Sequence, residues 1–141
     1  MPQHFIDKIM RHFSGNVHGR TIAVLGLSFK PDTDYMRFAP SITVIDALTR
    51  EGARVVAYDP VAMENAKKVL PDRVTYADNA YTAAHDADAV AIITEWNEFK
   101  QLDMVKLAKV LKNRVLFDGR NIYDPETLKS LGYEYYGVGR M

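Results

Sequence analysis

Cysteine is absent from this sequence of 141 residues. The chain therefore has no disulfide bonds, no thiolate metal sites and no cysteine nucleophile. An excess of one charge is missing as well, because 18 Lys and Arg residues balance 18 Asp and Glu residues. A neutral chain lacks the broad attraction with which basic proteins bind nucleic acid or anionic membranes. We therefore expect neither as a partner.

Long apolar runs are also missing. No stretch approaches the roughly 18 apolar residues of a membrane-spanning helix, and the N-terminus lacks the basic start and apolar core of a signal peptide. The sequence thus predicts a cytoplasmic protein. Its length and its 48% of hydrophobic residues are enough for one domain with a substantial core.

The apolar positions change repeatedly between strand-like and helical spacing, which is typical of α/β proteins with a parallel sheet. Six strands are predicted at residues 21–25, 54–58, 74–76, 89–93, 114–117 and 133–136. Helices are predicted between them at residues 41–51, 61–69, 80–86, 104–111 and 125–131. Several strands are continuous apolar runs, so we expect helices on both faces of the sheet. The predicted fold is a Rossmann-like, doubly wound parallel sheet in a three-layer α/β/α arrangement.

One further amphipathic segment, residues 5–13, precedes the first strand. Its apolar side chains fall on one helical stripe: Phe5, Ile6, Ile9, Met10 and Phe13. A helix at this place has no preceding strand to connect. We therefore interpret residues 1–16 as the end of a helix from an upstream domain and residues 17–141 as the domain itself. The stripe would then lack part of its packing partner.

The loop after the first strand is the most informative segment, because ligands of open α/β sheets bind at the carboxyl ends of the strands. This loop contains one glycine, Gly26, whereas dinucleotide-binding turns use several glycines to admit a pyrophosphate. The full dinucleotide fingerprint is therefore missing. The loop offers instead an aromatic ring at Phe29 beside Lys30, and a second cation at Arg37. A flat ring beside fixed charges suits a nucleobase or sugar that carries phosphate.

A structural explanation of the same loop stays open at this point. Phe29 could be a core ring, while Lys30 and Arg37 could form surface ion pairs with Asp32 and Asp34. The two acids could also hold a divalent cation, but acidic loop residues usually cap the backbone or face solvent. We predict no metal site.

Arg120 is the second candidate ligand residue. It follows the fifth predicted strand and Gly119, whose missing side chain permits a sharp turn. Its planar fork of donors suits phosphate or sugar hydroxyls. The alternative is an ion pair with Asp118 or Asp124.

Asp59 and Trp96 also follow predicted strands. Asp59 occupies the place of a ribose-binding acid in dinucleotide folds, but Asp-Pro is equally an ordinary start of a turn. Trp96 is expected to be a packing anchor rather than a ligand platform.

Five segments carry a resemblance to a known family. They read TIAVLGLSFKPDTDYMRFAPSI, VVAYDP, TEWNEF, LFDGRNIYDP and GYEYYGVGR. In this order and spacing they resemble the C-terminal UDP-binding domain of the UDP-glucose/GDP-mannose dehydrogenase family, over about residues 3–140.

The resemblance implies part of an NAD-dependent oxidoreductase that oxidises the C6 hydroxyl of UDP-glucose twice, to UDP-glucuronate. It implies that an NAD-binding domain and a central domain with the catalytic cysteine precede this chain, and that the parent enzyme is a homodimer. The chain alone is then expected to be inactive and to hold no catalytic residue.

The resemblance also assigns binding roles to residues of this chain. Phe29 and Lys30 match the pair that contacts the UDP-sugar, and Arg120 matches an arginine that reaches the substrate, from the neighbouring subunit in some members of the family. Arg37 matches an arginine that reaches the NAD held by the other domain.

The loop departs from the family at two positions. The family usually reads D-D-M-R-E-A-P-S, but here Tyr35 replaces the second Asp and Phe38 replaces Glu. The polar surroundings of Arg37 are therefore expected to differ from those in the family. Alternative interpretations are the same domain of a GDP-mannose or UDP-N-acetylhexosamine dehydrogenase, or a stand-alone nucleotide-binding module.

Overall fold

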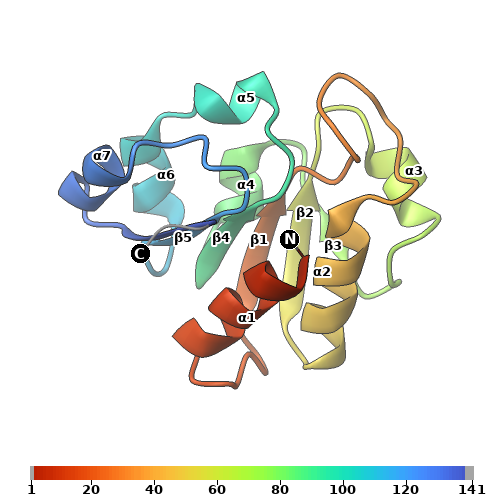
Figure 1. The fold of residues 1–141 in the computed structure, drawn as a ribbon, viewed down its shortest axis with the longest axis horizontal. Coiled ribbons are helices and arrows are strands. Elements are labelled where there is room, and N and C mark those ends of the chain that lie inside the picture. The colour runs from red at the N-terminus through yellow and green to blue at the C-terminus, as the bar shows by residue number, and fades with distance from the viewer. Residues whose placement is uncertain (1, 139–141) are drawn as a thin grey trace.

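All six strands of the sheet run parallel, in the order β3-β2-β1-β4-β5-β6. The computed structural model describes residues 2–138 and has the three-layer α/β/α architecture that the sequence predicts (Figure 1). Along this order the strand numbers fall from β3 to β1 and then rise from β4 to β6. The switch point of the doubly wound sheet therefore lies between the neighbours β1 and β4. The Rossmann-like fold is thus confirmed. Residues 139–141 of the predicted domain lie outside the described residues.

Each predicted strand is present, with ends that move by at most one residue. The strands are β1 (Thr21–Leu25), β2 (Arg54–Tyr58), β3 (Thr75–Tyr76), β4 (Ala89–Ile92), β5 (Val115–Asp118) and β6 (Glu134–Gly137). Side chains of the central strand point alternately to the two faces, so Ile22 and Val24 enter one core while Ala23 and Leu25 enter the other. Burial on both faces explains why the central strands β1, β4 and β5 are almost entirely apolar, whereas the edge strands β3 and β6 are partly exposed.

Helices cover both faces of the sheet. One core contains residues of α1 (Pro2–His12), α2 (Pro40–Arg50) and α3 (Met63–Lys67). The other contains residues of α4 (Ala80–Ala84), α5 (Asn97–Lys100), α6 (Met104–Val110) and α7 (Pro125–Ser130). The single-turn helix α5 was not predicted, because four residues are too few to show a helical period. No helix in residues 2–138 is long and apolar enough to cross a membrane.

Helix α1 packs on this domain. Phe5, Ile6 and Ile9 are buried in the first core, and the Phe5 ring meets the edge of Phe117 of β5 with 6.4 Å between ring centroids. These three residues thus have a packing partner within this domain, and the expectation that the stripe lacks part of its partner stays a prediction. A continuation of α1 into an upstream domain stays a prediction.

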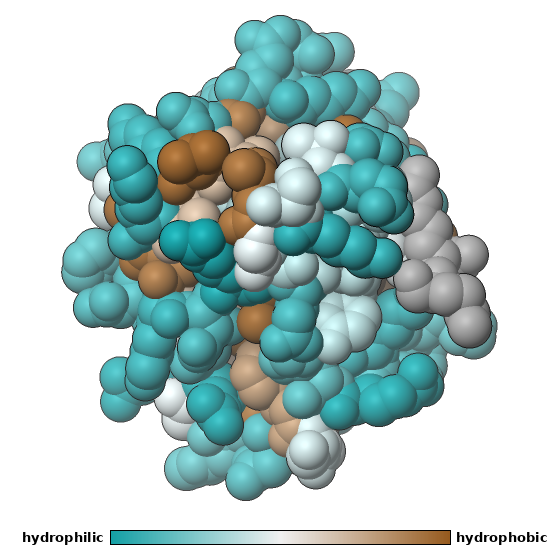
Figure 2. Space-filling model, turned by 90° about the vertical axis from the view of Figure 1, so that its left-hand side faces the viewer, coloured by the Kyte–Doolittle hydropathy of each residue, from teal (hydrophilic) through white to brown (hydrophobic). Residues whose placement is uncertain are grey.

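The carboxyl ends of the strands lie toward the top of Figure 1. The long loop between β1 and α2 rises there, and the segments after β4 and β5 reach the same edge (Figure 1). The side of the molecule at the left of Figure 1 exposes mainly hydrophilic side chains, with small apolar groups among them (Figure 2). Ligands of open α/β sheets bind at the carboxyl ends of the strands, so the candidate site lies at this edge.

Candidate functional site

Three segments meet at the carboxyl edge because their strands are neighbours in register. Leu25 at the end of β1 pairs with Ile92 of β4, and Ile92 pairs with Asp118 of β5. The segments that follow, residues 26–39, 93–96 and 119–124, are therefore brought side by side. These segments hold all four of the predicted binding residues.

Asp59, which directly follows β2, connects the loops of this edge through hydrogen bonds. Its carboxylate is fully buried, and Oδ2 accepts the backbone N–H groups of Leu27 at 2.8 Å and Ser28 at 3.0 Å. The indole N–H of Trp96 donates to the same oxygen at 3.2 Å. Oδ1 accepts the N–H groups of residues 61–62 at 2.9 and 2.8 Å, as in a turn that starts with Asp. Five donors thus occupy this carboxylate.

These hydrogen bonds determine whether Asp59 and the first loop can bind a dinucleotide. Backbone N–H groups at the start of such a loop cradle the pyrophosphate in dinucleotide-binding folds. Here the N–H groups of Leu27 and Ser28 already donate to Asp59, so they are unavailable to a phosphate. A buried and fully bonded carboxylate also leaves no free oxygen for a ribose hydroxyl. The edge therefore does not fit NAD in the usual dinucleotide position.

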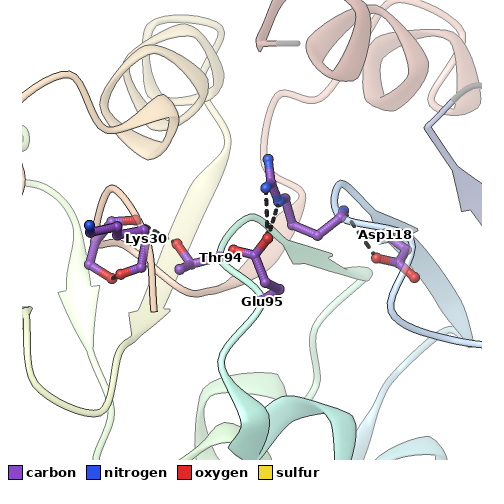
Figure 3. A network of polar contacts seen from close by, with 6 residues as sticks. Lys30, Thr94, Glu95 and Asp118 are labelled. Atoms are coloured by element: carbon purple, nitrogen blue, oxygen red, sulfur yellow. Dashed lines mark hydrogen bonds and ion pairs between the residues drawn. The ribbon is translucent and has the colours of Figure 1, made fainter. Parts of the chain in front are cut away.

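Gly26 allows the first loop to approach β4. Its φ is +93°, and a Cβ at this position would lie 2.5 Å from the backbone nitrogen of Thr94. The close approach lets Thr94 Oγ1 donate to the carbonyl of Ser28 at 2.7 Å, and Ser28 Oγ donates to the carbonyl of Lys30 at 2.8 Å. The backbone at Lys30 is thereby fixed relative to β4 (Figure 3).

Phe29 and Lys30 both reach the surface. The Phe29 side chain is 50% exposed, so it is not a core ring. Lys30 is exposed, and within residues 2–138 no ion pair joins it to Asp32 or Asp34. The ring and the cation are thus available to a ligand.

Arg37 lies in an apolar part of the same loop. Its guanidinium carbon is 5.1 Å from the centroid of the Phe38 ring, and Phe38 is 79% exposed. Phe38 has a φ of +60°, a conformation that is unusual for a bulky residue. A cavity of about 560 Å³ is lined by Phe29, Tyr35, Met36, Arg37, Phe38, Asn65, Lys68 and Val69. The Phe38 ring thus contacts Arg37 at a cavity whose lining is mainly apolar.

Asp118 at the end of β5 organises the turn that carries Arg120. Its buried carboxylate accepts the N–H groups of Arg120 at 3.2 Å and Tyr123 at 3.0 Å, and the hydroxyl of Tyr135 at 2.8 Å. Gly119 is required in this turn, because a Cβ there would lie 2.7 Å from the carbonyl oxygen of Ile92. The backbone of Arg120 is thus held in place.

The Arg120 guanidinium forms an ion pair with Glu95. Nε donates to Glu95 Oε2 at 2.9 Å and Nη2 donates to the same oxygen at 2.6 Å. This partner was missed: of the two acids considered, Asp118 binds the backbone of Arg120 instead. The signal that could have found it is topological, since Glu95 follows β4 and Arg120 follows the adjacent strand β5.

Glu95 is held in its charged form. Burial by itself would raise the pKa of its carboxyl, but its own backbone N–H, the hydrogen bonds and charge of Arg120, and the charge of Lys100 outweigh burial. The pKa of Glu95 therefore lies below its ordinary value.

In the view of Figure 3, Thr94 and Glu95 lie between Lys30 on one side and Asp118 on the other.

Among residues 2–138, no group of three or more His, Cys, Asp or Glu side chains is placed to hold a metal ion. The arrangement instead offers an exposed ring and two cations, Lys30 and Arg120, which suits an anionic ligand with a flat part.

Comparison with known proteins gives consistent matches. The sequence model described as the UDP-glucose/GDP-mannose dehydrogenase family, UDP binding domain, matches residues 23–125. The UDP-glucose 6-dehydrogenase TuaD of Bacillus subtilis is 43% identical over 137 residues, which cover 97% of this chain and 30% of that protein. The UDP-glucose 6-dehydrogenase of Rhizobium meliloti is 47% identical over 133 residues, covering 94% of this chain and 30% of that protein.

Solved structures show the same relationship. A UDP-glucose dehydrogenase from Pyrobaculum islandicum superimposes with a TM-score of 0.82 at 33% identity, over 99% of this chain and 30% of that chain. A UDP-D-ManNAc dehydrogenase from Pyrococcus horikoshii gives a TM-score of 0.77 at 25% identity, over 99% of this chain and 30% of that chain. The chain thus spans about 30% of the length of the relatives that it matches.

Proposed function

This chain belongs to the UDP-glucose/GDP-mannose dehydrogenase family, as its UDP binding domain, and we propose that it binds the UDP-sugar substrate of an NAD-dependent dehydrogenase. The observation that carries the proposal is the exposed pair Phe29 and Lys30 at the switch-point edge of the sheet, the same edge that carries Arg120. The dehydrogenase as a whole converts UDP-glucose to UDP-glucuronate in this proposal.

Each binding residue contributes a different interaction. Phe29 offers a flat apolar surface, Lys30 a point charge and Arg120 a planar fork that can bind two oxygens of a diphosphate. The two cations are available at the surface, with Lys30 exposed and the Arg120 side chain 41% exposed. They bind the diphosphate in this account.

The sugar is assigned as glucose from the similarity to UDP-glucose 6-dehydrogenases at 43% and 47% identity. Among the solved structures, the UDP-glucose dehydrogenase is 33% identical, whereas the dehydrogenases of UDP-N-acetyl-mannosamine are 25% to 28% identical, which favours glucose over the UDP-N-acetylhexosamine alternative. A GDP-mannose substrate rests on the family's name alone.

NAD is bound mainly by a different domain in this proposal. The N–H groups of Leu27 and Ser28 are occupied by Asp59, so this edge does not supply a dinucleotide cradle. Arg37 reaches toward the NAD from this side, with its guanidinium held over the Phe38 ring. NAD supplies the hydride acceptor, while this chain binds and orients the substrate.

The proposed partners are the NAD-binding and central domains of the parent enzyme, in a homodimer. The chain alone has no cysteine to hold an aldehyde intermediate, so we expect no NAD reduction from it with UDP-glucose. A stand-alone nucleotide-binding module is the alternative. A reading frame that continues upstream of residue 1 would support the parent enzyme, and one that begins there would support the module. The cytoplasmic location stays a prediction of the sequence.

Titration calorimetry of the chain with UDP and UMP tests the proposal. We expect weak UDP binding and weaker UMP binding, because UMP lacks the second phosphate for Lys30 and Arg120 to share. Circular dichroism on the same sample checks the fold. A folded chain that binds no UDP at millimolar concentration would contradict the proposed function.

A further inference from the structure

Arg120 uses only part of its guanidinium for the ion pair with Glu95. A guanidinium has five N–H donors, and Glu95 takes Nε and Nη2 through a single oxygen, Oε2. Within residues 2–138, Nη1 has no hydrogen-bond partner. The edge formed by Nη1 and the second Nη2 proton is therefore left for another acceptor.

Glu95 itself is well placed to hold Arg120. It follows Thr94, whose hydroxyl is bonded to the first loop at Ser28, so the segment after β4 contacts both of the segments that carry the proposed cations (Figure 3). Glu95 is charged, as its lowered pKa indicates, and only 28% of its side chain is exposed. The carboxylate is a fixed acceptor rather than a mobile surface group.

We propose that Glu95 is a positioning residue, which holds Arg120 by the Nε side so that the outer edge of the guanidinium faces the diphosphate of the ligand. This inference rests on the proposed function. An arginine side chain loses much rotational freedom when it binds a ligand, and orienting it beforehand removes part of that loss. Glu95 thereby increases affinity although it adds a negative charge next to an anion.

Two other roles for Glu95 predict different outcomes. If Glu95 competed with the phosphate for Arg120, its removal would increase the affinity for UDP. If the ion pair only stabilised the fold, its removal would lower the melting temperature and leave the affinity unchanged. The free outer edge of the guanidinium argues against competition, and the partial exposure of both partners argues against a large effect on stability.

A double-mutant cycle with UDP as the probe tests the inference. Glu95→Ala should weaken UDP binding by roughly threefold to tenfold, which is the range expected when one flexible side chain must be ordered on binding. Glu95→Gln should lie in between, because its amide oxygen can still accept from Nε without the charge. Arg120→Ala should weaken binding by roughly tenfold or more. In the Arg120→Ala background, Glu95→Ala should cause no further loss.

Glu98→Gln is the matched control. Glu98 lies three residues along the same segment and accepts the Tyr58 hydroxyl at 2.7 Å. Its replacement should leave the UDP affinity unchanged within about twofold, since that acid does not contact Arg120. Melting curves of all variants establish that they are folded. If Glu95→Ala does not fold, Glu95→Gln replaces it in the double-mutant cycle.

The outcomes separate the inference from the proposed function. Equal losses from Glu95→Ala in both backgrounds, unchanged affinity, or increased affinity would each overturn the positioning role while the effect of Arg120→Ala stands. An Arg120→Ala chain that binds UDP as tightly as the parent would overturn the proposed role of Arg120, and the positioning role with it.

Discussion

Two acids at the same edge of the sheet, Asp59 and Glu95, have opposite surroundings. Asp59 is completely buried and accepts five N–H groups, four of them from the backbone. Glu95 is partly exposed and binds one side chain, the guanidinium of Arg120. Asp59 therefore fixes backbone segments relative to one another, whereas Glu95 holds one side chain whose outer guanidinium edge is left for another acceptor.

The comparison teaches where function can be expected on this edge. Asp59 accepts the N–H groups that would bind a pyrophosphate in a dinucleotide-binding loop. The start of the first loop is therefore fixed to Asp59 and is not available to a phosphate. Charged groups beyond this support, Lys30 and Arg120, stay at the surface. We expect the buried acid to contribute to stability and the proposed binding residues to contribute to affinity, so variants of the two sets should affect different measurements.

The largest effect is expected for Asp59→Ala. It leaves five donors without their acceptor at a buried position, which should lower the free energy of unfolding by about 3 to 5 kcal/mol or prevent folding. Urea unfolding followed by circular dichroism measures the change. Asp103→Ala is the control, because Asp103 accepts two backbone N–H bonds at an exposed helix start and should cost only about 1 kcal/mol. Similar losses for the two variants would show that burial does not distinguish them.

A second effect is expected on binding rather than on stability. Lys30→Ala and Arg120→Ala should each lower the affinity for UDP roughly tenfold, since each removes one charged contact to phosphate. Their melting temperatures should stay close to that of the parent chain, because partly exposed cations contribute little to stability. Lys112→Ala, at the opposite end of the sheet, is the control for loss of one surface cation. A large fall in melting temperature with unchanged UDP affinity would assign Lys30 and Arg120 to the fold.

The smallest effect concerns the ionisation of Glu95. Its lowered pKa means that the folded state favours the carboxylate, so the contribution of Glu95 to stability is present above its ordinary pKa and is lost as pH falls through the lowered value. Carboxyl-detected NMR titration should find the Glu95 pKa below its ordinary range. In the Arg120→Ala variant this pKa should rise, because the guanidinium is one of the causes of the shift. The same pKa in both proteins would show that the ion pair does not persist in solution.

The fold could be predicted from the sequence because its central strands are buried on both faces. That burial forces continuous apolar segments such as 21–25 and 89–93, which are easy to recognise and end where polar loop residues begin. The helices were predicted less accurately: residues 61–69 were expected to be helical, but α3 covers Met63–Lys67. Amphipathic spacing continues into the turns on both sides of α3, so it does not reveal where the helix begins and ends.

The candidate site could be predicted only in part. Phe29, Lys30 and Arg120 stood out because ligand-binding residue types follow strands at the edge where ligands bind. Glu95 did not, because its role depends on the adjacency of β4 and β5, which becomes visible once the strand order is known. The role of Asp59 depends on N–H groups from three different segments. Such convergence of donors from distant segments leaves no pattern in the sequence.

The most direct test of the account is an NMR titration of the chain with UDP, with backbone amide signals assigned. We expect the signals that move to come from residues 27–38 and 118–122, because they surround the proposed cations at the carboxyl edge. The signals of Arg20 and Lys112, which line a cavity at the other end of the sheet, should stay in place. Shifts confined to Arg20, Lys112 and their neighbours, or no shifts at millimolar UDP, would contradict the claim that this edge binds the nucleotide sugar.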